Sequence, residues 1–184
     1  MIARRPLHPH GDQFAASGST GSTPDGNCIC SFWGDHRFLS NFFPVDLVFE
    51  GRVYPSVEHA YQAAKSLDGA VRAEIAALPR PGEAKRVADR TDVRPDWTDD
   101  LRIDVMSELI SLKFETPDLA ARLLDTGDAE LVEGNNWGDT FWGAVDGEGE
   151  NHLGRIMMAV RASLRSSTGA NRSAANRNDK DTSR

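Results

Sequence analysis

The hydrophobic positions of this chain change period several times, and the shortest apolar stretches predict strands. In the clearest case Val45, Leu47 and Phe49 alternate, and Glu50-Gly51 suits a tight turn, so a β-hairpin is predicted. Three stretches are predicted as strands or hairpins: CICSFWG (28–34), VDLVFEGRVYP (45–55) and AELVEG (129–134).

A helical period begins after Ser56, a residue type that favours the N-cap position. Four apolar residues recur there at i, i+3, i+4 and i+7 and predict a buried stripe: Val57, Ala60, Tyr61 and Ala64. A second helix is predicted near residues 70–78, where PRPG ends it. A short third helix is predicted at EAKRVADR, residues 83–90.

Three more helices are predicted in the second half of the chain. Thr98 and Thr116 suit N-caps, Pro117 suits the first helical position, and Gly127 suits the position after a helix end. The last helix, residues 151–165, has five apolar residues on one face: Leu153, Ile156, Met157, Val160 and Leu164.

These elements predict an α+β fold, dominated by helices, with a small β-sheet or hairpin. The 184 residues suffice for a single domain, which we place at residues 28–165. Residues 1–27 and 166–184 are rich in Ser, Gly, Asn and Thr and offer little to bury, so both ends are predicted to be disordered.

Charge and composition narrow the possible functions. The formal net charge is −7. Residues 1–27 are neutral and residues 166–184 carry +2, so residues 28–165 carry −9. This balance argues against a broad nucleic-acid surface but permits local phosphate recognition. No apolar run approaches the roughly 20 residues of a membrane span, and the N-terminus lacks a signal-peptide core. We therefore expect a cytoplasmic protein with no membrane partner.

The two cysteines, Cys28 and Cys30, are spaced awkwardly for a disulfide between separate elements. No second Cys/His cluster completes a zinc site, and EHAYQ is not the HExxH pattern. We expect two reduced cysteines and no metal.

The first predicted helix also has a polar stripe of Glu58, Gln62 and Lys65, at spacing i, i+4 and i+7. Spacing alone favours a solvated face, on which Glu58 interacts with the helix dipole. His59 is interpreted as a hydrogen-bonded, half-buried residue. A catalytic carboxylate is the alternative for Glu58.

Three other stretches combine chemistry-bearing residues. SNFFP (40–44) places Asn41 among aromatics, and NNWGDTFWG (135–143) places Asp139 among tryptophans and glycines. Either loop is structural or contacts a planar or sugar ligand. The third stretch, GEAKRVADRTDVRPDW (82–97), concentrates basic residues, which form a solvated helix face or a phosphate site.

Together these stretches resemble the NADAR domain, also called the YbiA-like family. The resemblance rests on SNFFP, YPSVEHAYQAAK, AKRVADRTDVRPDW, DTFWG and GEGENHLGRIMMAVR, and it covers the whole predicted domain. One departure is visible: the usual aromatic after the Glu-His pair comes one place later, as Ala60-Tyr61. We expect this shift to alter packing rather than chemistry.

The resemblance implies an N-glycosidase that hydrolyses a ribosyl C1′–N bond without metal or cofactor. Glu58 and Asp139 resemble its acidic pair, with Glu58 as the water-activating base and Asp139 as the ribose-holding or oxocarbenium-stabilising group, or the reverse. Lys85 and Arg90 would bind phosphate. The implied substrate-binding residues are Asn41, Phe42, Gln62, Lys65, Lys85, Arg90, Trp97, Trp142 and Asn151.

The family is associated with two substrate classes. One is ADP-ribose on guanine bases of DNA or RNA, where members oppose DarT-like toxins; this is the expectation here. The other is the phosphorylated ribosylaminopyrimidine intermediates of riboflavin biosynthesis. The same residues also suit a non-catalytic ADP-ribose or NAD-binding module, or a tryptophan loop that binds a protein. The oligomeric state is not indicated.

Overall fold

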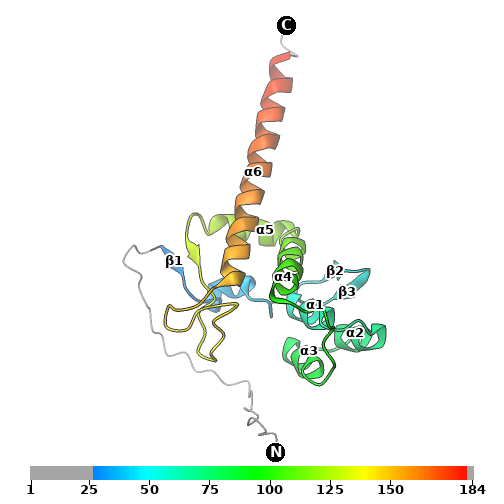
Figure 1. Ribbon diagram of the computed structural model, residues 1–184. Coiled ribbons are helices and arrows are strands. Elements are labelled where there is room, and N and C mark those ends of the chain that lie inside the picture. The colour runs from blue at the N-terminus through cyan, green and yellow to red at the C-terminus, as the bar shows by residue number, and fades with distance from the viewer. Residues whose placement is uncertain (1–26, 182–184) are drawn as a thin grey trace, which may run out of the picture.

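Helix α4 (Asp99–Lys113) lies between two groups of elements in the computed structural model, which describes residues 27–181 and side chains up to residue 167. Figure 1 shows these groups on opposite sides of α4. The first group comprises β2 (Leu47–Phe49), β3 (Arg52–Tyr54), α1 (Val57–Ala64), α2 (Gly69–Ala76) and α3 (Pro81–Ala88). The second comprises β1 (Cys28–Ile29), α5 (Pro117–Asp125), β4 (Glu130–Leu131) and α6 (His152–Asp181).

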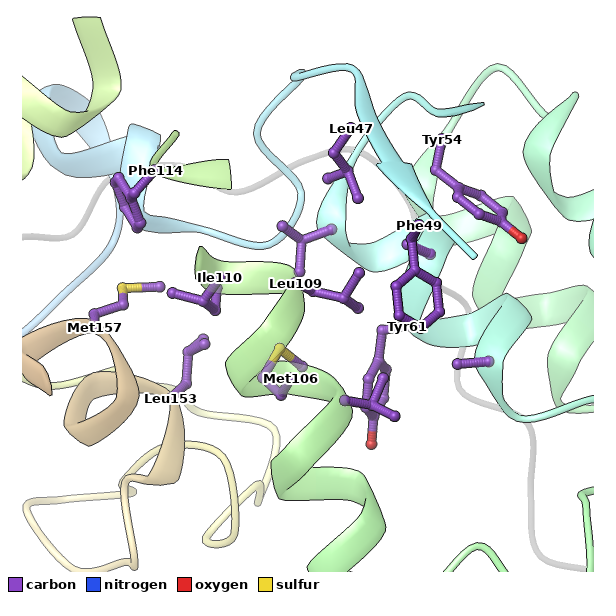
Figure 2. Close-up of a cluster of buried hydrophobic side chains, with 14 of the residues drawn as sticks. Leu47, Phe49, Tyr54, Tyr61, Met106, Leu109, Ile110, Phe114, Leu153 and Met157 are labelled. Carbon is purple, nitrogen blue, oxygen red and sulfur yellow. The ribbon is translucent and has the colours of Figure 1, made fainter. Parts of the chain in front are cut away.

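The hydrophobic core follows from the position of α4, because this helix buries residues against both groups. Met106, Leu109 and Ile110 are almost fully buried. Figure 2 shows Leu109 beside the hairpin residue Leu47, and Ile110 between Phe114 and Leu153 of α6. The core thus joins the two groups into one domain and fixes α1 relative to the start of α6.

The two small sheets confirm the predicted strands in shortened form. Strands β2 and β3 pair antiparallel, with Leu47 opposite Tyr54. The hairpin turn has positive φ at Glu50 (47°) and Gly51 (75°), the backbone conformation that two-residue hairpins favour. Strands β1 and β4 pair in parallel, with Cys28 opposite Glu130, so the predicted strand 28–34 is reduced to two residues.

The predicted helices are present, and their caps explain most of their starts. The Ser56 hydroxyl accepts a hydrogen bond from the backbone N–H of His59 at 3.3 Å. Thr98 accepts one from Leu101 at 3.3 Å. Thr116 occupies its predicted N-cap position but makes no side-chain capping bond. One short 3-10 helix (η1, Gly34–Leu39) was not predicted; it precedes the loop that contains Asn41.

The prediction of a disordered tail from residue 166 is wrong for residues 166–181, which continue α6. This stretch contains a single glycine and no proline, and it extends a helix that has already formed, so it avoids the cost of nucleation. Figure 1 shows α6 projecting well beyond the rest of the domain. The predicted disorder of residues 1–26 lies outside the described residues. No described helix is long and apolar enough to cross a bilayer.

The prediction of two reduced cysteines is also wrong in this structure, because Cys28 and Cys30 form a disulfide. Residues two apart in an extended segment direct their side chains to the same side, and the two Cα atoms are 5.4 Å apart. Reduced cysteines would have been typical of the cytoplasm, and the disulfide is not; the cytoplasmic location stays a prediction.

The start of α6 packs so closely on β4 that one position admits only glycine. A β-carbon at Gly154 would overlap the carbonyl oxygen of Leu131 and the side chain of Asn151. Gly154→Ala is therefore expected to destabilise the domain by about 1–3 kcal/mol, although alanine favours helices, because overpacking outweighs propensity. Urea unfolding measures this change. Gly82→Ala in α3, where a β-carbon meets nothing, is the matched control and should be neutral or stabilising.

Candidate active site

Helix α1 is buried over its whole length, including Glu58 and Gln62 of the polar stripe that spacing alone assigned to solvent. Glu58 is 7% exposed and Gln62 is 4% exposed, whereas Lys65 is half-buried. The Gln62 amide nitrogen donates a hydrogen bond to Glu58 Oε1 at 2.8 Å. The interpretation of Glu58 as a solvated surface charge is therefore wrong.

The neighbours of Glu58 shift the pKa of its carboxyl group in opposite directions. Burial raises the pKa of its carboxyl group, while the Gln62 hydrogen bond and the positive charges of Lys85 and Lys65 lower it. Burial in turn lowers the pKa of Lys65, which the charge of Glu58 opposes. Opposing influences of this kind on a buried carboxyl group mark it as a candidate for a functional site.

The SNFFP loop contacts the N-terminus of α1 and places Asn41 beside Glu58. The carbonyl oxygen of Asn41 accepts a hydrogen bond from the backbone N–H of Glu58 at 3.0 Å. Buried Lys113 of α4 holds the preceding residues, since its Nζ donates to the carbonyl oxygens of Leu39 (3.1 Å) and Ser40 (2.8 Å). The position of Asn41 thus depends on α1 and α4 together.

An aromatic group adjoins α1 and brings together two of the predicted tryptophans. The ring of Tyr61 lies 5.6 Å from Trp97 and 5.5 Å from Trp142, between centroids. The guanidinium of Arg102 lies 4.0 Å from the Phe141 ring centroid and so links α4 to the glycine-rich loop, residues 135–143. Tyr61, one place later than in the family pattern, therefore packs between the predicted substrate-binding tryptophans.

The glycine-rich loop is ordered by Asp139, whose carboxylate has a structural task. Its Oδ1 accepts hydrogen bonds from the backbone N–H groups of Phe141 (3.1 Å) and Trp142 (2.9 Å). The Asn135 side chain accepts from the N–H of Asp139 (3.0 Å) and donates to its carbonyl oxygen (2.7 Å). Only the second carboxylate oxygen of Asp139 is left for a ligand.

Glu133, which sequence reasoning missed, interacts electrostatically with both predicted acids. The negative charges of both Asp139 and Glu58 act on its carboxyl group. Asn151 fixes this segment: its Oδ1 accepts from the backbone N–H of Glu133 at 3.1 Å, and its Nδ2 donates to the carbonyl of Leu131 at 2.9 Å. Both amide atoms of Asn151 therefore bind backbone, so in this arrangement it positions β4 instead of presenting a free amide.

The remaining predicted residues contribute unevenly. Lys85 is exposed, yet its charge reaches Glu58. Phe42 and Arg90 are exposed, and within the described residues no side-chain hydrogen bond, ion pair or ring contact joins them to the others. His59 is structural: its ring nitrogens bond Ser56 Oγ (2.7 Å) and the Leu78 carbonyl (3.2 Å).

Two residues missed by the sequence reasoning had detectable signals. Lys113 falls at i+7 from Met106 and at i+3 from Ile110, on the apolar stripe of α4, where a charged residue is unexpected. Glu133 lies near the end of the predicted strand 129–134, just before the loop of residues 135–143, a position from which a side chain can enter a site built by loops. Neither signal would have shown the interaction between the two residues.

Comparison with known proteins identifies the class to which this fold and site belong. The family model of the NADAR domain matches residues 22–165. The chain therefore belongs to the NADAR domain family. The NMR structure of YbiA from Escherichia coli matches with a TM-score of 0.68 and 33% identity, over 77% of this chain and 88% of that one. The expected YbiA-like, helix-dominated fold is thus confirmed.

Similar proteins are named either as N-glycosidases or as riboflavin biosynthesis proteins. An N-glycosidase of Nostoc punctiforme is 37% identical over 140 residues, 72% of this chain and 88% of that protein. The N-glycosidase YbiA of Escherichia coli is 36% identical over 134 residues, 71% of this chain and 82% of that protein. A riboflavin biosynthesis protein of Vibrio vulnificus is 41% identical over 135 residues, which are 71% of this chain but 36% of that protein.

Proposed function

We propose that this chain is an N-glycosidase that hydrolyses the bond between C1′ of a ribosyl group and a nitrogen atom. The observation that carries the proposal is a buried carboxyl group, Glu58, beside two lysines and an aromatic group in a family with N-glycosidase relatives. Cleavage of this bond builds positive charge on the ribose, which a nearby carboxylate stabilises. Glu58 then accepts a proton from the water that attacks C1′.

The substrate we propose is ADP-ribose linked to a guanine of DNA or RNA. Lys65 and Lys85 supply positive charge for a pyrophosphate, and Trp97 and Trp142 supply ring faces for a base. Trp33 precedes η1 and the loop that contains Asn41, and Trp137 lies within the loop of residues 135–143. Both are about half exposed and offer ring faces on which neighbouring bases of a nucleic acid can stack. An enzyme with an acidic domain can act on one extruded base without long backbone contacts.

A second candidate substrate is a phosphorylated ribosylaminopyrimidine. It is favoured by the relatives named as riboflavin biosynthesis proteins, from Vibrio vulnificus and Zea mays. The same carboxylate and lysines suit this substrate, because it has the same C1′–N bond and a phosphate. A non-catalytic ADP-ribose or NAD-binding module is the remaining alternative; it requires the cationic and aromatic groups but not Glu58.

One assay separates these candidates. The protein is incubated with guanine-ADP-ribosylated DNA and with the ribosylaminopyrimidine phosphate, and the released base or pyrimidine is measured by chromatography. We expect release from the ADP-ribosylated DNA at a rate well above that for the riboflavin intermediate. The opposite order would reassign the substrate, and ADP-ribose binding without turnover of either compound would favour the binding module.

A further inference from the structure

The side chain of Gln62 has one hydrogen-bond partner among the described residues, the carboxylate of Glu58. The two residues are four positions apart on α1, so their side chains lie on the same face of the helix. The Gln62 amide nitrogen donates to Glu58 Oε1 at 2.8 Å, and both side chains are buried. Because a carboxylate only accepts hydrogen bonds, the amide must turn its nitrogen toward Glu58 and its oxygen away.

The oxygen of this amide is left without a partner. Gln62 Oε1 is fully enclosed, and no group in the described part of the chain donates a hydrogen bond to it. A buried, unpaired amide oxygen costs free energy, which an apolar side chain of the same size would avoid. Packing alone would therefore favour methionine or leucine at this position. The amide of Gln62 thus has its use in the contact that it does make, which is the one to Glu58.

Glu58 is held at its backbone and at one of its two carboxylate oxygens. Its backbone N–H donates to the carbonyl oxygen of Asn41 at 3.0 Å, while Gln62 holds Oε1. No described group bonds Glu58 Oε2, and this oxygen, unlike Gln62 Oε1, is not fully enclosed. A carboxylate that is held by one oxygen presents the other oxygen in a defined direction. The two oxygens of Glu58 are therefore not equivalent, and Oε2 is the one left for a reaction.

We propose that Gln62 is a positioning residue for Glu58: its amide holds Oε1, so that Oε2 takes the proton of the attacking water. This assignment rests on the proposed function and adds no chemical step to it. The hydrogen bond also favours the carboxylate form, because an N–H group bonds a charged oxygen more strongly than a neutral one. It thereby counters burial, which raises the pKa of the same carboxyl group.

The other titratable groups around Glu58 act on it from a greater distance. Five such side chains interact electrostatically with its carboxylate: Lys65, Lys85, Asp89, Tyr61 and Glu133. Within the described residues none of these five forms a hydrogen bond or ion pair with Glu58, so none of them sets the direction of its oxygens. The bond from Gln62 is different, because it acts on both the charge and the orientation of the carboxylate.

The first test is the pH dependence of kcat and KM on guanine-ADP-ribosylated DNA for the wild type and Gln62→Met. Methionine is close to glutamine in size but donates no hydrogen bond. On the acidic side of the profile we expect kcat to fall about tenfold with little change in KM. The difference should narrow as the pH rises, because higher pH restores the carboxylate form of Glu58. Gln62→Leu serves the same purpose if the methionine variant does not fold.

Ser66→Ala is the matched control for a buried polar residue at the end of the same helix. Ser66 is 5% exposed, and its hydroxyl accepts a hydrogen bond from the backbone N–H of Asp68 at 3.1 Å. It is absent from the groups that act on Glu58. This variant should be less stable than the wild type but keep its pH profile. A profile of Gln62→Met that matches the wild type, or that is lowered equally at every pH, overturns the proposal.

The second test needs no turnover and so separates this inference from the proposed function. In protein with ¹³C-labelled glutamate carboxyl groups, the signal of Glu58 is the one that is missing from Glu58→Gln. This signal should titrate at higher pH in Gln62→Met than in the wild type, and Ser66→Ala should leave it in place. An unchanged titration in Gln62→Met overturns the proposal. An inactive wild type with a displaced titration would refute the proposed function alone.

Discussion

Glu58→Gln is expected to lower turnover about 10³-fold while the affinity for ADP-ribose changes little. Glutamine preserves the size of the side chain, and its amide oxygen can still accept the hydrogen bond of Gln62, which is 2.8 Å long in the wild type. The substitution therefore removes the charge and the basicity but little else. Base catalysis contributes about 10²–10⁴-fold, and the lost stabilisation of the ribosyl cation adds to this effect. Base release measures the rate, and calorimetry measures the affinity.

The control for this variant is Glu74→Gln on α2, whose exposed carboxylate is absent from the surroundings of Glu58. It should behave as the wild type in both measurements. Burial raises the pKa of Glu58, so its ionisation lowers stability as the pH rises through that raised pKa. Glu58→Gln lacks this loss and should be no less stable than the wild type at pH 8. Normal turnover in Glu58→Gln would falsify its catalytic role.

The elements of this fold were predictable because their signals are local. Ser56 and Thr98 cap the helices that they predict, and Glu50-Gly51 forms the turn of the predicted hairpin. Sequence reasoning missed a disulfide within one segment and the extension of the last helix. Cys28 and Cys30 were judged as partners for separate elements, although two residues of one extended segment can pair. The tail was judged by composition alone, although an existing helix extends more easily than a new one forms.

In the candidate site, the burial and the contacts of single side chains could not be predicted from the sequence. Periodicity placed Glu58 on a polar stripe, but only the packing of α1 against α3, α2 and α4 shows that this stripe is buried. Asn151 was expected to bind substrate, yet it bonds the backbone on both sides of Val132. Glu133 and Lys113 are 20 positions apart, and their electrostatic interaction arises only from the fold.

Lys113→Ala is expected to destabilise the domain by about 3–5 kcal/mol, the largest loss of stability predicted here. The change leaves a cavity where the lysine stem packed, and it removes the hydrogen bonds to the carbonyl oxygens of Leu39 and Ser40. It also removes the positive charge that faces Glu133. Lys113→Met retains most of the volume, so its loss at pH 7 should be smaller, about 1–2 kcal/mol. Urea unfolding measures both variants.

The pH dependence separates the charge of Lys113 from its packing. Burial lowers the pKa of Lys113 from 10.5 to about 7, so the folded protein binds fewer protons than the unfolded chain between these values. The stability that neutral Lys113 contributes is complete above pH 10.5 and is lost as the pH falls to about 7. Methionine has no such titration, so the difference between wild type and Lys113→Met should grow from pH 7 to pH 9. A constant difference would mean that Lys113 stays charged throughout this range, with its ammonium group compensated by Glu133 and the two carbonyl oxygens.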